Sequence, residues 1–232
     1  IVLCTQALKL SLSLFKGESS QSFLGKVREK NIAKSYKNLG AFYCLKSNYQ
    51  LALDYYFKGL LTYISLDDKK AIFSSLSNIG VVYWNTGDYP KALDYYFKAL
   101  NIAEESGNKK EIAPILGNIG IIYSIQKDYK QALNYYFKAL RLSQELGDDD
   151  RTAYHLGNIG IVYFEQANYP KALEYYSRAL KIDEKQENKN KIAIWLGNIG
   201  EVYYELKNYS KTLQYHNKAL EMTEELDDKK GI

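Results

Sequence analysis

The sequence predicts an all-α fold in which tandem helix–turn–helix repeats stack into an α-solenoid. Three observations carry this prediction: a fixed internal period, helical spacing of apolar residues within each copy, and helix-breaking residues between the helices. An Asn-Leu-Gly or Asn-Ile-Gly triplet recurs every 40 residues without insertion or deletion, which defines five copies at 31–70, 71–110, 111–150, 151–190 and 191–230. One helical hairpin cannot bury both of its apolar stripes, so the copies must stack to form a core.

The chain before the first copy fits this period less well. Thr5-Gln6-Ala7-Leu8 resembles the end of a second helix, so residues 1–30 are expected to hold a partial preceding repeat or N-terminal helices. At the other end, residues 227–232 resemble residues 67–72, where a new copy begins. We therefore expect the array to continue past residue 232.

The copy at 71–110 shows how each element arises. Its first helix is predicted from about Ala71 to about Thr86, with apolar residues at three-and-four spacing. Gly87-Asp88 interrupts the pattern, and Asp88 is a natural N-cap for the second helix, a place held elsewhere by Asn48, Asp128, Asn168 and Asn208. Pro90 follows in the first turn, where the missing N–H costs nothing.

The second helix of this copy carries Ala92, Leu93, Tyr96, Ala99 and Leu100, and it is expected to end near Gly107. A four-residue connection, Gly107-Asn108-Lys109-Lys110, should then lead into the next first helix. Short connections place neighbouring helices antiparallel. The recurring Gly and Ala columns are expected where two helices approach closely, so a larger side chain at Gly120 should separate its helices.

Composition excludes several classes of function. The net charge is +4, from 31 basic and 27 acidic residues, a balance too even to indicate nucleic acid binding. No apolar run is long enough for a membrane span. Cys4 and Cys44 lack metal-site or redox spacing and are expected to be reduced thiols in a cytoplasmic protein.

No catalytic pattern is present in the sequence. The two histidines lie in different copies: His155 is expected to be a surface residue, and His216 replaces a core tyrosine. Acidic clusters such as Asp67-Asp68 and Asp148 to Asp150 are interpreted as solubility features, because they lack the spacing of a calcium loop. We therefore expect a protein that is not an enzyme and that needs no cofactor or metal.

The repeat resembles the tetratricopeptide repeat. Leu76, Gly80, Tyr83, Ala92, Tyr96 and Ala99 match the signature columns of that family, and the resemblance covers 31–230. Two features depart from it: Leu or Tyr replaces the signature Trp, and the period is 40 rather than about 34. The longer form is similar to the repeats of spindle-orientation adaptors, kinesin light chains and bacterial signalling proteins. The resemblance implies a right-handed superhelix whose first helices line a concave, ligand-binding face.

A column of asparagines on these first helices is the first candidate for a binding site. A side-chain amide offers both a donor and an acceptor, which suits an extended peptide backbone, and similar proteins hold peptides with such ladders. The alternative is that each Asn only caps a neighbouring repeat. The candidate residues are Asn38, Asn78, Asn118, Asn158 and Asn198.

An apolar strip is expected beside the asparagines, with charged residues at its ends. Its members are Val81, Trp84, Ile121, Ile125, Ile161 and Phe164, and the small residues Ser77, Gly117, Gly157 and Gly197 are expected to open space next to it. Lys34 and Lys37 lie at the first copy, whereas Glu165, Glu201 and Glu205 lie at the last two. A row of cations on the second helices, Lys58, Lys98, Lys138, Arg178 and Lys218, is interpreted as a solvated face.

These observations favour a module that binds a protein or peptide in the concave groove, as the sensory or scaffolding part of a larger signalling protein. An alternative is a self-association element that forms a homodimer and thereby pairs an attached effector domain. RNA binding is disfavoured, because the groove lacks a high density of Arg and Lys. No membrane partner is expected.

Overall fold

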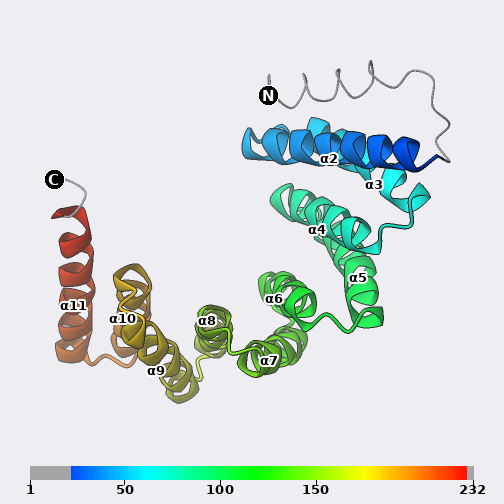
Figure 1. Ribbon diagram of the computed structural model, residues 1–232. Coiled ribbons are helices and arrows are strands. Elements are labelled where there is room, and N and C mark those ends of the chain that lie inside the picture. The colour runs from blue at the N-terminus through cyan, green and yellow to red at the C-terminus, as the bar shows by residue number, and fades with distance from the viewer. Residues whose placement is uncertain (1–21, 229–232) are drawn as a thin grey trace. The chain divides into compact units, whose positions relative to one another are not determined.

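The structure is a computed structural model that describes residues 22–228 of the chain, and every regular element in that range is an α-helix (Figure 1). The predicted fold, an α-solenoid of helix–turn–helix repeats, is confirmed. The helices are α2 (Phe23–Leu45), α3 (Tyr49–Ser65), α4 (Lys69–Asn85), α5 (Tyr89–Glu105), α6 (Lys109–Ile125), α7 (Tyr129–Glu145), α8 (Asp149–Glu165), α9 (Tyr169–Lys185), α10 (Lys189–Glu205) and α11 (Tyr209–Asp228).

The helices form two compact units, divided between Asn108 and Lys109. In the first unit α2 to α5 pack in chain order, each on its neighbour, and α2 also lies beside α4. In the second unit α6 to α11 pack in the same way, and α6 lies beside α8. Helix α2 begins at Phe23, earlier than the copy boundary at residue 31. The rest of the expected partial repeat, and any continuation of the array past residue 232, lie outside the described residues.

The period of 40 has a simple origin in the structure. Each helix from α3 to α10 has 17 residues, and a three-residue turn follows it, so one helix and one turn occupy half a period. The connection between copies is therefore as short as the turn within a copy. The expected four-residue link from Gly107 to Lys110 is instead Ser106 to Asn108, and Lys109 already begins α6.

One turn design recurs at both kinds of connection. In the turn after α4, Gly87 has a left-handed φ of 76°, and the Asp88 N–H donates to the Tyr83 carbonyl, which closes the helix end. The Asp88 carboxylate then accepts a hydrogen bond from the Lys91 N–H, as predicted for an N-cap. Asp68 and Asp148 cap α4 and α8 in the same way. The interpretation of these two aspartates as solubility features was therefore wrong.

The glycine of each triplet lies where the two helices of a repeat meet. A Cβ built on Gly120 would lie 2.7 Å from Cε1 of Tyr136, and the same clash recurs between Gly80 and Tyr96 at 2.6 Å. Since no side chain fits in that gap, only glycine allows the buried tyrosine to lie against the first helix. The predicted close approach at Gly120 is confirmed.

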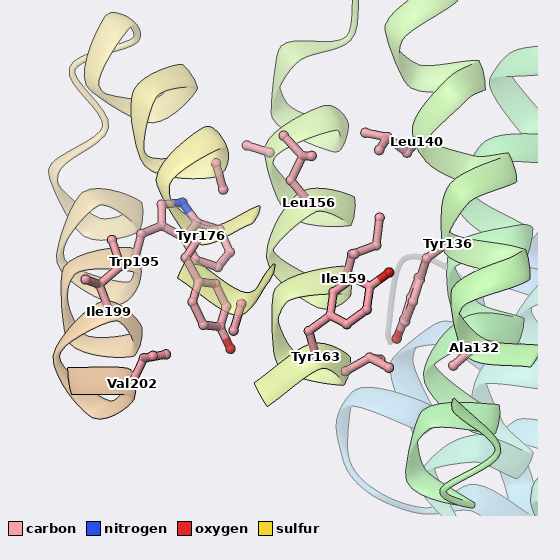
Figure 2. Packing of buried hydrophobic residues seen from close by; sticks show 14 residues of the cluster. Ala132, Tyr136, Leu140, Leu156, Ile159, Tyr163, Tyr176, Trp195, Ile199 and Val202 are labelled. Carbon is pink, nitrogen blue, oxygen red and sulfur yellow. The ribbon is translucent and has the colours of Figure 1, made fainter. Parts of the chain in front are cut away.

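The core of the second unit continues from one repeat to the next (Figure 2). Tyr136 from α7 and Tyr176 from α9 lie on either side of Ile159 from α8, and Trp195 from α10 extends the cluster. Buried apolar side chains of this size each contribute roughly 1.5–3 kcal/mol to folding. This continuous core holds the first helices in a fixed order and leaves their remaining face free for another role.

Candidate functional site

The predicted site residues all lie on first helices, and each unit brings its own set together. The first unit holds Lys34, Lys37 and Asn38 on α2, and Asn78, Val81 and Trp84 on α4. The second unit holds Asn118, Ile121 and Ile125 on α6, Asn158, Ile161 and Phe164 on α8, and Asn198, Glu201 and Glu205 on α10.

Four positions of each first helix, spaced four, three and four, form the stripe that is named here the first-helix stripe. On α8 these are Tyr154, Asn158, Ile161 and Glu165; α6 has Pro114, Asn118, Ile121 and Ile125, and α10 has Ile194, Asn198, Glu201 and Glu205. All twelve side chains are at least partly exposed. Ile125 is 45% exposed and Ile161 is 40% exposed, although both are large apolar residues. Apolar surface of this kind marks candidate interaction sites.

On α8 and α10 the asparagine is the most enclosed member of the stripe. Asn118, Asn158 and Asn198 are each half-buried. The Nδ2 atom of Asn158 is buried and has no hydrogen-bond partner among the described residues. A buried donor without a partner costs roughly 1–3 kcal/mol. The Asn158 amide nitrogen therefore donates no hydrogen bond to a neighbouring repeat.

The charged residues at the two ends differ in their contacts. On α2, Lys34 is exposed, and the Lys37 Nζ lies 3.5 Å from Oγ of Ser74 on α4. On α10, Glu201 lies 3.6 Å from Nε2 of His216, and Glu205 accepts a hydrogen bond of 3.5 Å from the Tyr169 hydroxyl. These carboxylates therefore have neutral or weakly basic neighbours.

Two of the small residues beside the apolar strip, Gly117 and Gly157, do not open space as predicted. A Cβ on Gly117 would lie 2.7 Å from Cε1 of His155, and a Cβ on Gly157 would overlap the indole of Trp195. In each case the gap left by glycine in one first helix is filled by a ring from the next first helix. Gly197 alone among the three has nothing within 4 Å of such a Cβ.

His155 is a buried residue, and its expected place on the surface was wrong. Its side chain is 1% exposed, and neither ring nitrogen has a partner among the described residues. Burial is the main cause that lowers the pKa of His155 from 6.5 to about 4; the neighbouring Arg151 adds to the lowering, and Asp148 opposes it. His155 is therefore neutral at physiological pH and serves as part of the junction between α6 and α8.

A polar contact that sequence reasoning missed joins α9 to α10. Asp183 is fully buried, and its Oδ2 accepts a hydrogen bond of 2.6 Å from Nε1 of Trp195. Its Oδ1 lies 3.7 Å from the Lys191 ammonium, which also pairs with Asp150 at 2.5 Å. The signal was present in the sequence, because Asp183 stands in a column that holds Ala103 and Ser143 in earlier copies.

The cation row on the second helices has a structural role. In each repeat a tyrosine from each helix forms a stacked pair, as in Tyr163 and Tyr175 with centroids 5.4 Å apart. Cations lie over both outer faces of this pair, Lys171 at 4.8 Å and Arg178 at 5.2 Å from the ring centroids. Such contacts stabilise each hairpin modestly. The cations of this row therefore interact with the protein itself.

Neither a metal centre nor a membrane span emerges from the described part of the chain. Residues 22–228 contain no group of three or more His, Cys, Asp or Glu side chains that could hold a metal ion. Within the same range no helix is both long and apolar enough to cross a membrane.

Comparisons with known proteins agree with this architecture. Two tetratricopeptide repeat family models match the chain, one over 31–105 and 111–185 and the other over 192–226. No curated protein matches the sequence.

Several solved structures share the fold at low sequence identity. BtubC from P. vanneervenii is similar with a TM-score of 0.83 and 20% identity, over 97% of this chain and 90% of that one. A signal-transduction ATPase from Pyrococcus horikoshii, which carries a tetratricopeptide repeat sensor, gives a TM-score of 0.80 and 20% identity. That match covers 97% of this chain but 34% of the ATPase.

A Rap protein complexed with competence and sporulation factor gives a TM-score of 0.70 at 16% identity, over 95% of this chain and 59% of the Rap chain. At these identities the likeness shows a common fold. The family models, in contrast, match the amino-acid sequence itself, and the matched residues make up most of the chain. The chain belongs to the tetratricopeptide repeat family.

Proposed function

We propose that this chain is a binding module that holds an extended segment of a partner protein, or a peptide, against the first-helix stripe. Membership of the tetratricopeptide repeat family supports a role in protein interaction or regulation. The observation that carries the finer proposal is the column formed by Asn118, Asn158 and Asn198, which are half-buried at the same position of successive first helices beside the exposed side chain of Ile161.

The chemistry of the stripe suits a peptide backbone. A side-chain amide can donate to a backbone carbonyl and accept from a backbone N–H at the same time. Asn118, Asn158 and Asn198 repeat this pairing on successive first helices, and Ile121 and Ile161 provide apolar contact beside them. The asparagines would supply affinity with little choice of sequence, while the apolar residues would select apolar side chains.

Related structures make a regulatory setting reasonable. The similar ATPase from Pyrococcus horikoshii carries its repeats as a sensor, and similar Rap proteins are found in complex with competence and sporulation factor or with the Phr* peptide. By analogy, we propose that these repeats are the sensory or scaffolding part of a signalling protein.

The test is a peptide-library selection followed by calorimetry on the variant with Asn118→Ala and Asn158→Ala. Each lost amide contact should cost roughly 0.5–1.5 kcal/mol, so the selected peptides should bind several-fold more weakly. The matched control replaces Asn134 and Asn217, which are exposed on second helices of the same unit. Unchanged affinity in the first variant, with an intact fold, would show that the asparagines do not contact the ligand.

Self-association is a second candidate, because α11 exposes an apolar face. Leu213 is 64% exposed, whereas its counterparts Leu133 and Leu173 are half-buried and pack against the core of the second unit. Light scattering of the chain across a concentration series tests this candidate. A constant monomer mass would exclude it.

A further inference from the structure

The first-helix stripe of the second unit changes its chemistry from α6 to α10. The stripe position held by Ile125 on α6 is held by Glu165 on α8 and by Glu205 on α10. The neighbouring position is Ile121, then Ile161, then Glu201. All of these side chains are at least partly exposed, so the substitutions are not forced by packing in the core. The stripe is therefore apolar at α6 and acidic at α10.

The carboxylates of Glu165, Glu201 and Glu205 differ from other acidic side chains of the repeats in their ion pairs. At the opposite edge of the repeats, Glu105 pairs with Lys69 at 3.1 Å and Glu145 with Lys109 at 2.8 Å. Among the described residues, no Lys or Arg forms an ion pair with Glu165, Glu201 or Glu205. Lys211 follows α10 closely in the chain, but its ammonium lies over the ring of Tyr203 at 4.6 Å.

The acidic part of the stripe also has an aromatic neighbour. Farther along the stripe, near the N-terminal ends of α8 and α10, Tyr154 and Ile194 are 45% and 55% exposed. Tyr204, which precedes Glu205, is 54% exposed and packs edge-on against Tyr209. Because Tyr204 is exposed and adjacent to Glu205 in the chain, a Lys or Arg that pairs with this carboxylate has an aromatic ring close by.

We infer that the partner segment bound by the second unit is apolar where it crosses α6 and carries Lys or Arg where it crosses α10. This inference rests on the proposed function, since it assumes that the first-helix stripe is the binding face. Charge complementarity supports it: an acidic segment over Glu201 and Glu205 would meet like charges, which reduces affinity and association rate. The change from apolar residues at α6 to acidic residues at α10 also sets the direction in which the segment binds. A segment bound in the reverse direction would place its cations over Ile121 and Ile125.

The probes are short fluorescent peptides with an apolar block joined to a Lys/Arg block, and matched peptides with an Asp/Glu block in its place. With the intact chain, the basic peptides should bind and lose affinity as salt is raised. The variant with Glu201→Lys and Glu205→Lys should bind them about fivefold more weakly or worse, the change that a single exposed ion pair can supply. Glu184→Lys and Glu221→Lys, on exposed second-helix positions, are the matched controls.

A photo-crosslinker at each end of the basic peptide tests direction. The apolar end should label α6, and the basic end should label α10. Equal binding of acidic and basic peptides, or unchanged affinity in the Glu201 and Glu205 variant, would overturn the inference while leaving the proposed function intact, provided that the Asn118 and Asn158 variant still loses affinity. If no peptide of either kind binds the chain, the inference and the proposed function both fail.

Discussion

The indole Nε1 of Trp195 donates a 2.6 Å hydrogen bond to the fully buried carboxylate of Asp183, and this bond joins α10 to α9. A carboxylate in such a place is costly unless its oxygens have donors. Lys191 approaches the second oxygen at 3.7 Å, which leaves the indole as the nearer donor.

Trp195→Phe should therefore lower the free energy of unfolding by about 1–3 kcal/mol, because it leaves a buried acceptor without its donor. Urea denaturation measures the change. Adding Asp183→Ser, the residue that stands at Ser143 in the preceding copy, should recover part of the loss. Strictly additive effects in the double variant would show that the two residues are not coupled.

Two glycines of one column should respond in opposite ways to alanine. Gly157→Ala places a Cβ into the indole of Trp195 and should cost about 1–3 kcal/mol of stability. Gly197→Ala meets nothing within 4 Å, and alanine favours a helix by up to about 1 kcal/mol over glycine, so this variant should be slightly more stable. Thermal unfolding of both variants compares them, and equal shifts would contradict the packing described here.

Acid should weaken the fold through His155. The pKa of the folded residue is lowered from 6.5 to about 4 by burial. The unfolded chain then binds a proton that the folded chain excludes, so stability falls as the pH drops from 6.5 to about 4. The loss is at most about 3 kcal/mol. Urea midpoints at several pH values should fall less steeply for His155→Phe, and parallel profiles would argue against this role.

The turns offer a matched pair of backbone variants. Ala167 has a φ of 53° at the turn position that Gly147 occupies with a φ of 64°. Side chains disfavour this region by about 1–2 kcal/mol. Ala167→Gly should stabilise the fold by up to about 1 kcal/mol after the entropy of glycine is counted, and Gly147→Ala should destabilise it. A Cβ at Gly147 meets nothing within 4 Å, so any loss of thermal stability there reports on the backbone alone.

Much of the fold could be predicted from local patterns in the sequence. Asp88 and Gly87 specify their turn by their own chemistry, and the exact recurrence of Gly120 indicates a close approach whatever its partner. The spacing of Asn118, Ile121 and Ile125 likewise places them on one stripe, because helical geometry alone determines that arrangement.

The contacts between repeats could not be predicted in this way. Gly117 looked open because the ring that fills its space belongs to His155 in the next copy. His155 and Asp183 are polar residues, and whether such a residue is buried depends on its distant partners. Asp68 and Asp148 were misjudged because clusters of acids concealed their single capping role.

His155 fills the junction between α6 and α8, whereas Trp195 fills the junction between α8 and α10. This difference affects how nearly identical repeats assemble in the correct order during folding. Similar repeats can misassemble during folding, when one helix takes the place of its counterpart in another repeat. If α8 occupied the place of α10, His155 would leave empty part of the space shaped for an indole, and Asp183 would lose its donor. Side-chain size and one buried hydrogen bond thus distinguish helices that the repeat itself makes almost interchangeable, and they favour a single register of assembly.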